Sequence, residues 1–160
     1  MIEITENPAD RANHIPWPPI IQVSALLGAW LLGWLMPWPL LPEAMPVRGL
    51  GWLVFAGGLG IAISGMRYFR SIGTPVDPTG SAQKLADGGI YNWTRNPMYA
   101  GVSMAFAGLA FGLASAWLLV LALLMPLALQ KLAIEPEEAY LTRRFGTAYA
   151  AYCARVRRWL

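Results

Sequence analysis

Four long apolar runs constrain the fold of this chain more than any other feature of its sequence. They cover residues 20–36, 49–66, 98–114 and 117–133. Each run is close in length to the ~20 residues with which an apolar helix crosses the core of a bilayer. Lipid offers the backbone no hydrogen-bond partner, so segments of this kind must be helical. The sequence therefore predicts an all-α, polytopic integral membrane protein with four transmembrane helices.

The composition agrees with this prediction and argues against other classes of protein. Only 13% of the residues are charged, whereas soluble domains carry about 25%. Cys153 is the only cysteine and His14 the only histidine, so we expect neither an internal disulfide nor a metal site. The basic C-terminal segment is short and follows apolar helices, which favours membrane lipids over nucleic acid as its partner.

We expect a single domain over residues 1–160. Residues 1–66 hold the first two transmembrane helices, and residues 67–160 hold a loop, a helical hairpin and a C-terminal helix. With four spans, both termini share a side of the membrane with the loop of residues 67–96. That side carries eleven of the twelve Lys and Arg residues, and only Arg48 lies on the other side. The positive-inside rule therefore predicts that the loop and both termini face the cytoplasm.

Two polar segments lie where apolar runs end. Residues 88–101 cover the end of the long loop of residues 67–96 and the start of the third apolar run, and loops of this length in compact proteins are often functional. Residues 137–152 have the pattern of an amphipathic helix. Apolar residues recur in this second segment at spacings of three and four, at Leu141, Phe145, Ala148, Tyr149 and Tyr152.

At these segments the chain resembles the isoprenylcysteine carboxyl methyltransferase family, and more broadly the membrane methyltransferases that include phospholipid N-methyltransferases. The resemblance covers roughly residues 67–160, and similar short bacterial members suggest a location in the bacterial inner membrane. The matching pieces are Gly73-Thr74-Pro75-Val76-Asp77-Pro78, Gly89-Ile90-Tyr91, Arg95-Asn96-Pro97-Met98-Tyr99-Ala100-Gly101, Glu137-Glu138, Leu141, Phe145-Gly146, Tyr149, Tyr152 and Val156-Arg157-Arg158-Trp159. Relatives often carry histidine where Asn96 stands, so proton transfer by that side chain is not available here.

The resemblance implies an S-adenosylmethionine-dependent methyltransferase with a cytoplasmic cofactor pocket, a lipophilic acceptor that enters from the membrane, and no metal. The leading acceptor is a carboxylate, such as that of an isoprenylcysteine-like molecule or another hydrophobic molecule or lipid. The resemblance gives catalytic roles to Arg95 and Glu138. It places cofactor binding at Tyr91, Arg95, Asn96, Pro97, Tyr99, Gly101, Glu137 and Glu138, and substrate binding at Thr74 and Tyr149.

Each of these residues also has a plain structural interpretation. Arg95 can pair with the cofactor carboxylate as a bidentate fork or anchor the chain at lipid phosphates. Glu137 and Glu138 can accept hydrogen bonds from the ammonium or ribose of the cofactor, or stabilise a helix by their negative charge at its N-terminus. The tyrosines can attract the sulfonium or form an interfacial belt. Gly101 allows either close approach of a ligand or helix packing, and Thr74 fits a capped turn equally well.

The acceptor decides whether a base is needed. A carboxylate is already anionic at pH 7, whereas an amine or phenol must lose a proton, for which Glu138 or Tyr99 is the nearest candidate in type. Two other functions stay open: an NADPH-dependent membrane reductase of related topology, and a non-catalytic membrane protein. The sequence has no clear dinucleotide fingerprint, and a shared fold alone does not decide the chemistry.

Overall fold

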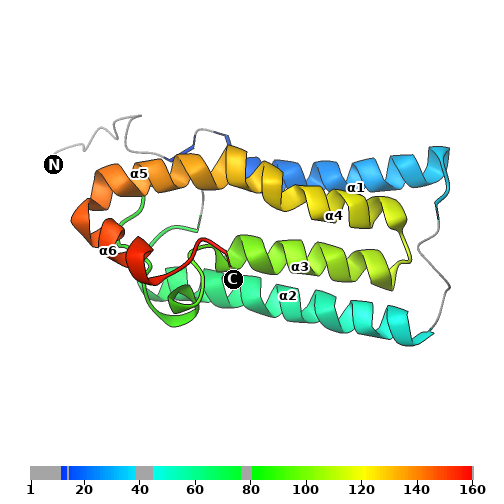
Figure 1. Cartoon of the computed structure of the whole chain (residues 1–160), viewed down its shortest axis with the longest axis horizontal. Helices are drawn as coiled ribbons and strands as arrows, with labels where there is room; N and C mark the ends of the chain where they lie inside the picture. The colour runs from blue at the N-terminus through cyan, green and yellow to red at the C-terminus, as the bar shows by residue number, and fades with distance from the viewer. Residues whose placement is uncertain (1–11, 14, 39–44, 77–80, 160) are drawn as a thin grey trace, which may run out of the picture.

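A computed structural model describes residues 12–13, 15–38, 45–76 and 81–159, so His14, Asp77 and Pro78 lie outside the described residues. Helices are the only regular elements of this described part, which confirms the all-α prediction (Figure 1). They are α1 (Trp17–Leu35), α2 (Met45–Ser71), the 3₁₀ turn η2 (Gly89–Asn92), α3 (Pro97–Gly112), α4 (Ala116–Leu129), the π-helical η3 (Gln130–Ile134), α5 (Glu135–Phe145) and α6 (Thr147–Arg155).

The long helices run side by side, and η2, α5 and α6 gather at one end of the bundle (Figure 1). α2 packs on α3, α3 on α4, and α4 on α1. Glycine makes the α2–α3 contact close, because a Cβ on Gly101 would lie 2.6 Å from Gly58 O and from Ala62 N. At the other end, α3 and α4 are joined by a tight turn in which Ser115 Oγ accepts from Leu118 N.

Among the described residues, three helical segments are long and apolar enough to cross a membrane: α1, α2 and the continuous stretch Ala116–Phe145. α3 is a shorter apolar helix of 16 residues. It runs lengthwise between the longer helices, so the predicted four-helix membrane architecture is present with one short member (Figure 1).

Several predicted boundaries were wrong, most clearly at the end of α2 and before α5. α2 continues five residues past the predicted end at Met66 to Ser71, because leaving the apolar region does not by itself end a helix. The predicted break between the fourth span and the C-terminal helix is also absent. There the chain forms a π-turn, in which Glu135 N donates to Gln130 O. This shift in hydrogen bonding immediately precedes Pro136, which has no N–H to donate.

The predicted helix over residues 137–152 is in fact two helices that meet at Gly146. Gly146 has φ +53° and ψ −122°, a conformation that ends α5 and begins α6 in a new direction. Tyr149 and Tyr152 of α6 are buried in a core with Tyr91 and Val156. Leu141 and Phe145 of the predicted apolar face pack against this core, whereas Ala148 is exposed.

Candidate functional site

A pocket of about 320 Å³ lies at the end of the bundle where η2, α5 and α6 gather. Pockets for small molecules and cofactors usually have ~300–1,000 Å³. Eight of the ten predicted site residues line it: Thr74, Tyr91, Arg95, Asn96, Tyr99, Glu137, Glu138 and Tyr149. Residues from the loop, α3, α5 and α6 therefore meet around one cavity, although they are far apart in the sequence.

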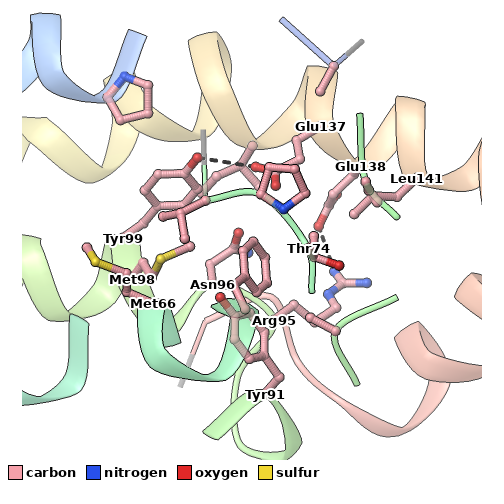
Figure 2. A pocket seen from close by; sticks show the side chains of 18 of the residues that line it. Met66, Thr74, Tyr91, Arg95, Asn96, Met98, Tyr99, Glu137, Glu138 and Leu141 are labelled. Atoms are coloured by element: carbon pink, nitrogen blue, oxygen red, sulfur yellow. Dashed lines mark hydrogen bonds and ion pairs between the residues drawn. The ribbon is translucent and has the colours of Figure 1, made fainter. Parts of the chain in front are cut away.

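The methionines and the charged residues of the lining lie on different sides of the pocket. Figure 2 shows Met66 and Met98 on one side and Arg95 and Glu138 on the other, where the apolar Leu141 also lies. Pro18, Pro19 and Gln22 of α1 also contribute to the walls. The sequence analysis did not single out these residues. Apolar side chains of a spanning helix, such as Pro18 and Pro19, give no signal that separates pocket lining from lipid contact, and Gln22 is a polar residue within an apolar run.

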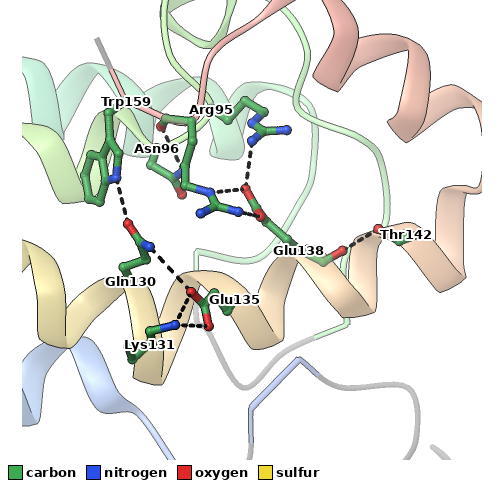
Figure 3. A network of polar contacts seen from close by, with 9 residues as sticks. Arg95, Asn96, Gln130, Lys131, Glu135, Glu138, Thr142 and Trp159 are labelled. Atoms are coloured by element: carbon green, nitrogen blue, oxygen red, sulfur yellow. Dashed lines mark hydrogen bonds and ion pairs between the residues drawn. The ribbon is translucent and has the colours of Figure 1, made fainter.

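Glu138 is held between two guanidinium groups (Figure 3). Arg95 Nη2 lies 3.1 Å from Glu138 Oε1, and the two side chains are only 15% and 18% exposed. Arg158 donates from Nε to Oε1 at 3.1 Å and from Nη2 to Oε2 at 2.6 Å. The hydrogen bonds to Glu138 raise the pKa of Arg158. Both carboxylate oxygens are therefore occupied, and Glu138 is fixed in one orientation.

The neighbouring Glu137 has different surroundings. The Tyr99 hydroxyl donates to Glu137 Oε2 at 3.2 Å, as the dashed line in Figure 2 marks. Within the described part of the chain, no Lys or Arg forms an ion pair with Glu137. This carboxylate thus lines the pocket with an oxygen that can accept from a bound ligand.

Two donors of pocket-lining residues have no partner. Among the described side chains, the buried polar atoms without a hydrogen bond are Tyr91 Oη, Arg95 Nε and Ser103 Oγ. Burial raises the pKa of Tyr91 well above its usual value, so its hydroxyl stays protonated as a donor. Leaving such a donor unpaired costs about 1–3 kcal/mol. Two residues that line the pocket therefore each hold a buried donor that a ligand with acceptor oxygens could satisfy.

Hydrogen bonds hold the loop that carries these donors. Tyr91 stacks on Phe69 of α2 with ring centroids 5.2 Å apart, and its carbonyl accepts from Tyr152 Oη at 2.8 Å. A side chain at Gly88 or Gly89 would collide with the Tyr68 ring, so these glycines let the loop lie against α2. Tyr91 is thereby buried with its ring against the pocket.

Thr74 and Asn96 line the pocket, but their side chains have bonds of their own. Thr74 Oγ1 donates to Lys84 O and accepts from Lys84 N, both at 3.2 Å, which closes the loop as a capped turn would. Asn96 Nδ2 donates to Arg158 O at 3.0 Å. These bonds favour a shaping role over direct ligand recognition for both side chains.

Pro97 and Gly101 are not among the pocket-lining residues. Pro97 is fully buried in the first turn of α3, where its missing N–H has no helical partner to lose. Gly101 faces α2, where a side chain would meet the backbone of Gly58 and Ala62. The structure thus gives Gly101 the helix-packing role. The start of α3 has no side-chain cap, so its first N–H groups keep bonding capacity.

The fold and the site define an integral membrane protein with one polar-to-apolar ligand pocket at the end of its bundle. The sequence profile of the phospholipid methyltransferase family matches residues 47–148, well over half of the chain. The chain therefore belongs to this family of membrane methyltransferases, which includes the isoprenylcysteine carboxyl methyltransferases. No curated protein and no solved structure matches it.

Proposed function

We propose that this protein is an S-adenosylmethionine-dependent methyltransferase that acts on a lipophilic acceptor at the cytoplasmic face of the membrane. The observation that carries the proposal is the pair of unpartnered donors, Tyr91 Oη and Arg95 Nε, on two residues that line a pocket with charged groups on one side and methionines on another. Family membership supports methyl transfer in general, and the pocket chemistry supports this cofactor.

The lining residues fit the functional groups of the cofactor. Its carboxylate and ribose oxygens match the donors Arg95 Nε and Tyr91 Oη, and a guanidinium is well suited to a carboxylate. Its ammonium matches Glu137, which has no cationic partner among the described residues. The rings of Tyr91 and Tyr99 can attract a sulfonium through their faces. When bound, the cofactor supplies an already activated methyl group.

The chain itself then contributes alignment and exclusion of water. Methyl transfer from a sulfonium is an in-line displacement, and proximity alone is worth up to ~7–11 kcal/mol in well-aligned systems. Arg95, fixed by Glu138, would orient the polar end of the cofactor. The apolar side near Met66 and Met98 would take the acceptor.

The acceptor class depends on proton transfer. The leading proposal is a carboxylate of an isoprenylcysteine-like molecule or another hydrophobic compound or lipid, which needs no base. For an acceptor that must lose a proton, Glu137 is better placed than Glu138, because both Glu138 oxygens already accept from arginines. A carboxylate acceptor thus needs nothing more from the pocket, and an acceptor that must lose a proton has Glu137. The acceptor itself must be found by assay.

Calorimetric titration of the detergent-purified protein with S-adenosylhomocysteine tests this function, with NADPH as the competing ligand. We expect saturable binding of S-adenosylhomocysteine alone. Arg95→Gln should weaken it at least about tenfold, because a charged hydrogen bond contributes ~1.5–3 kcal/mol. Arg144→Gln, an exposed arginine on α5, should leave it unchanged.

The other outcomes separate the remaining functions. Binding of NADPH alone would replace methyl transfer by the reductase. Binding of neither ligand, in the presence of added membrane lipid, would favour a non-catalytic protein.

A further inference from the structure

The last described residues of the chain form a strap across the polar side of the pocket. We define this C-terminal strap as residues 156–159. Arg157 O accepts from Arg95 N at 2.9 Å, and Arg158 O accepts from Thr94 Oγ1 at 3.0 Å. Trp159 Nε1 donates to Gln130 Oε1 at 3.2 Å, which ties the strap to η3 (Figure 3). The strap is thus bonded both to the loop and to the helix that carry the pocket residues.

Arg158 does not line the pocket, yet it controls how Glu138 can pair with Arg95. Arg158 occupies both oxygens of Glu138 with two nitrogens. Arg95 reaches Oε1 with Nη2 only, and its Nε stays unpaired. Arginine and carboxylate prefer a fork of two parallel bonds. Without Arg158, Glu138 would be free to form such a fork with Arg95 and to occupy Nε.

We propose that Arg158 is a positioning residue, which holds Glu138 by a two-nitrogen fork so that Arg95 Nε stays available to the cofactor. This inference rests on the proposed function, because it assigns Arg95 Nε to the cofactor carboxylate. Arg158 is also outside the range of the family match, which ends at residue 148.

Titration with S-adenosylhomocysteine tests the proposal on the full chain. Arg158→Gln should raise Kd at least about tenfold, because it frees Glu138 to take up Arg95 Nε. Arg158→Lys keeps the charge but donates from one nitrogen, so its Kd should lie between those of the wild type and of Arg158→Gln. The matched control is Arg155→Gln. Arg155 also pairs with a carboxylate, Asp87 at 3.1 Å, but at an exposed site, and its loss should leave Kd unchanged.

A double-mutant cycle separates positioning from simple stabilisation. Arg158→Gln should add no loss of affinity to Glu138→Gln, because no carboxylate is left to be held. A purely structural role would lower Tm in thermal unfolding and leave Kd unchanged, which would overturn the proposal. Losses that multiply in the double variant would overturn it too.

Folding of the variants and the behaviour of the wild type complete the test. If Arg158→Gln lacks a cooperative unfolding transition, Arg158→Lys decides, and wild-type affinity in that variant would refute the fork. If the wild type itself does not bind S-adenosylhomocysteine, the proposed function fails and this inference fails with it. If the wild type and Arg158→Gln bind S-adenosylhomocysteine equally, the proposed function stands and the positioning role of Arg158 is refuted.

Discussion

At the scale of single residues, two adjacent glutamates on one helix have different partners and therefore different capacities. Glu138 accepts from Arg158 on both oxygens and forms an ion pair with Arg95, so both oxygens are bound to protein. Glu137 accepts only the Tyr99 hydroxyl among the contacts described. The two glutamates are of the same residue type, and their partners make the difference. Glu138 is held by protein groups, whereas Glu137 can bind a ligand.

Tyr91 offers a test in which stability and binding change differently. Tyr91→Phe removes a buried hydroxyl that has no partner, so the free energy of unfolding should stay the same or rise by up to about 1 kcal/mol. The same change removes the donor that we propose for the cofactor. Binding of S-adenosylhomocysteine should therefore weaken by about 0.5–1.5 kcal/mol, roughly two- to twelvefold in Kd.

Tyr152→Phe is the matched control for this prediction. Its hydroxyl donates to Tyr91 O at 2.8 Å, so its removal leaves a buried carbonyl unpaired and should destabilise the fold by about 1–3 kcal/mol. Thermal unfolding and titration of both variants make the comparison. A Tyr91→Phe protein that unfolds earlier and binds normally would show that the hydroxyl has a structural partner instead.

At the scale of elements, close packing of α2 on α3 fixes the wall of the pocket that Ala62 and Met66 form. A Cβ on Gly58 would lie 2.5 Å from Gly101 O and from Ala105 N, and backbone atoms cannot retreat as a flexible side chain can. Gly58→Ala should therefore destabilise the protein by about 1–3 kcal/mol.

Gly60 lies on the same helix, where an added Cβ would meet no other atom within 4 Å. Gly60→Ala should thus be neutral or stabilising by up to about 1 kcal/mol, since alanine is the better helix former. Thermal unfolding in the same detergent compares the two variants. An equal loss of stability in both variants would mean that the close contact at Gly58 does not hold α2 against α3.

The sequence predicted the helices well and their ends poorly. Apolar runs locate α1 to α4 because lipid demands a continuous helix. The same argument says nothing once the chain leaves the apolar region, so the extension of α2 to Ser71 was missed. The turn at Gly146 was missed because the spacing of apolar residues continues across it, while its positive φ appears only in three dimensions.

The site was predictable in part for a similar reason. Family-like motifs brought in Arg95 and Glu138, and the structure places both at the pocket. Arg158 also lies in a family-like piece, residues 156–159, but no site role was predicted for it and its charge suits an anchor near lipid phosphates. Only its two bonds to Glu138, twenty residues earlier, reveal another contact.

At the scale of the whole molecule, the pocket and the ion pairs of Glu138 lie at one end of an apolar bundle, the end at which α5 and α6 gather in Figure 1. The helices leave many large apolar side chains exposed, such as Trp30, Trp34 and Leu53, as expected for contact with lipid. A pocket at one end of a membrane-spanning bundle opens toward one side of the membrane, so the orientation of the bundle decides on which side the proposed cofactor must be supplied.

Cysteine labelling determines this orientation, and the positive-inside rule predicts a cytoplasmic pocket. In a Cys153→Ser background, Val47→Cys places a thiol at the far end of α2, and Ala148→Cys places one on α6 at the pocket end; both positions are exposed. A membrane-impermeant maleimide is added to bacterial cells with a permeabilised outer membrane. Val47→Cys should react in intact cells, and Ala148→Cys only after lysis. The reason is that eleven of the twelve Lys and Arg residues are on the predicted side of the pocket, and that side is expected to stay in the cytoplasm. The cysteine-free protein measures the background. The reverse pattern would place the pocket outside the cytoplasm, away from the compartment in which S-adenosylmethionine is made, and would remove the basis for the proposed activity.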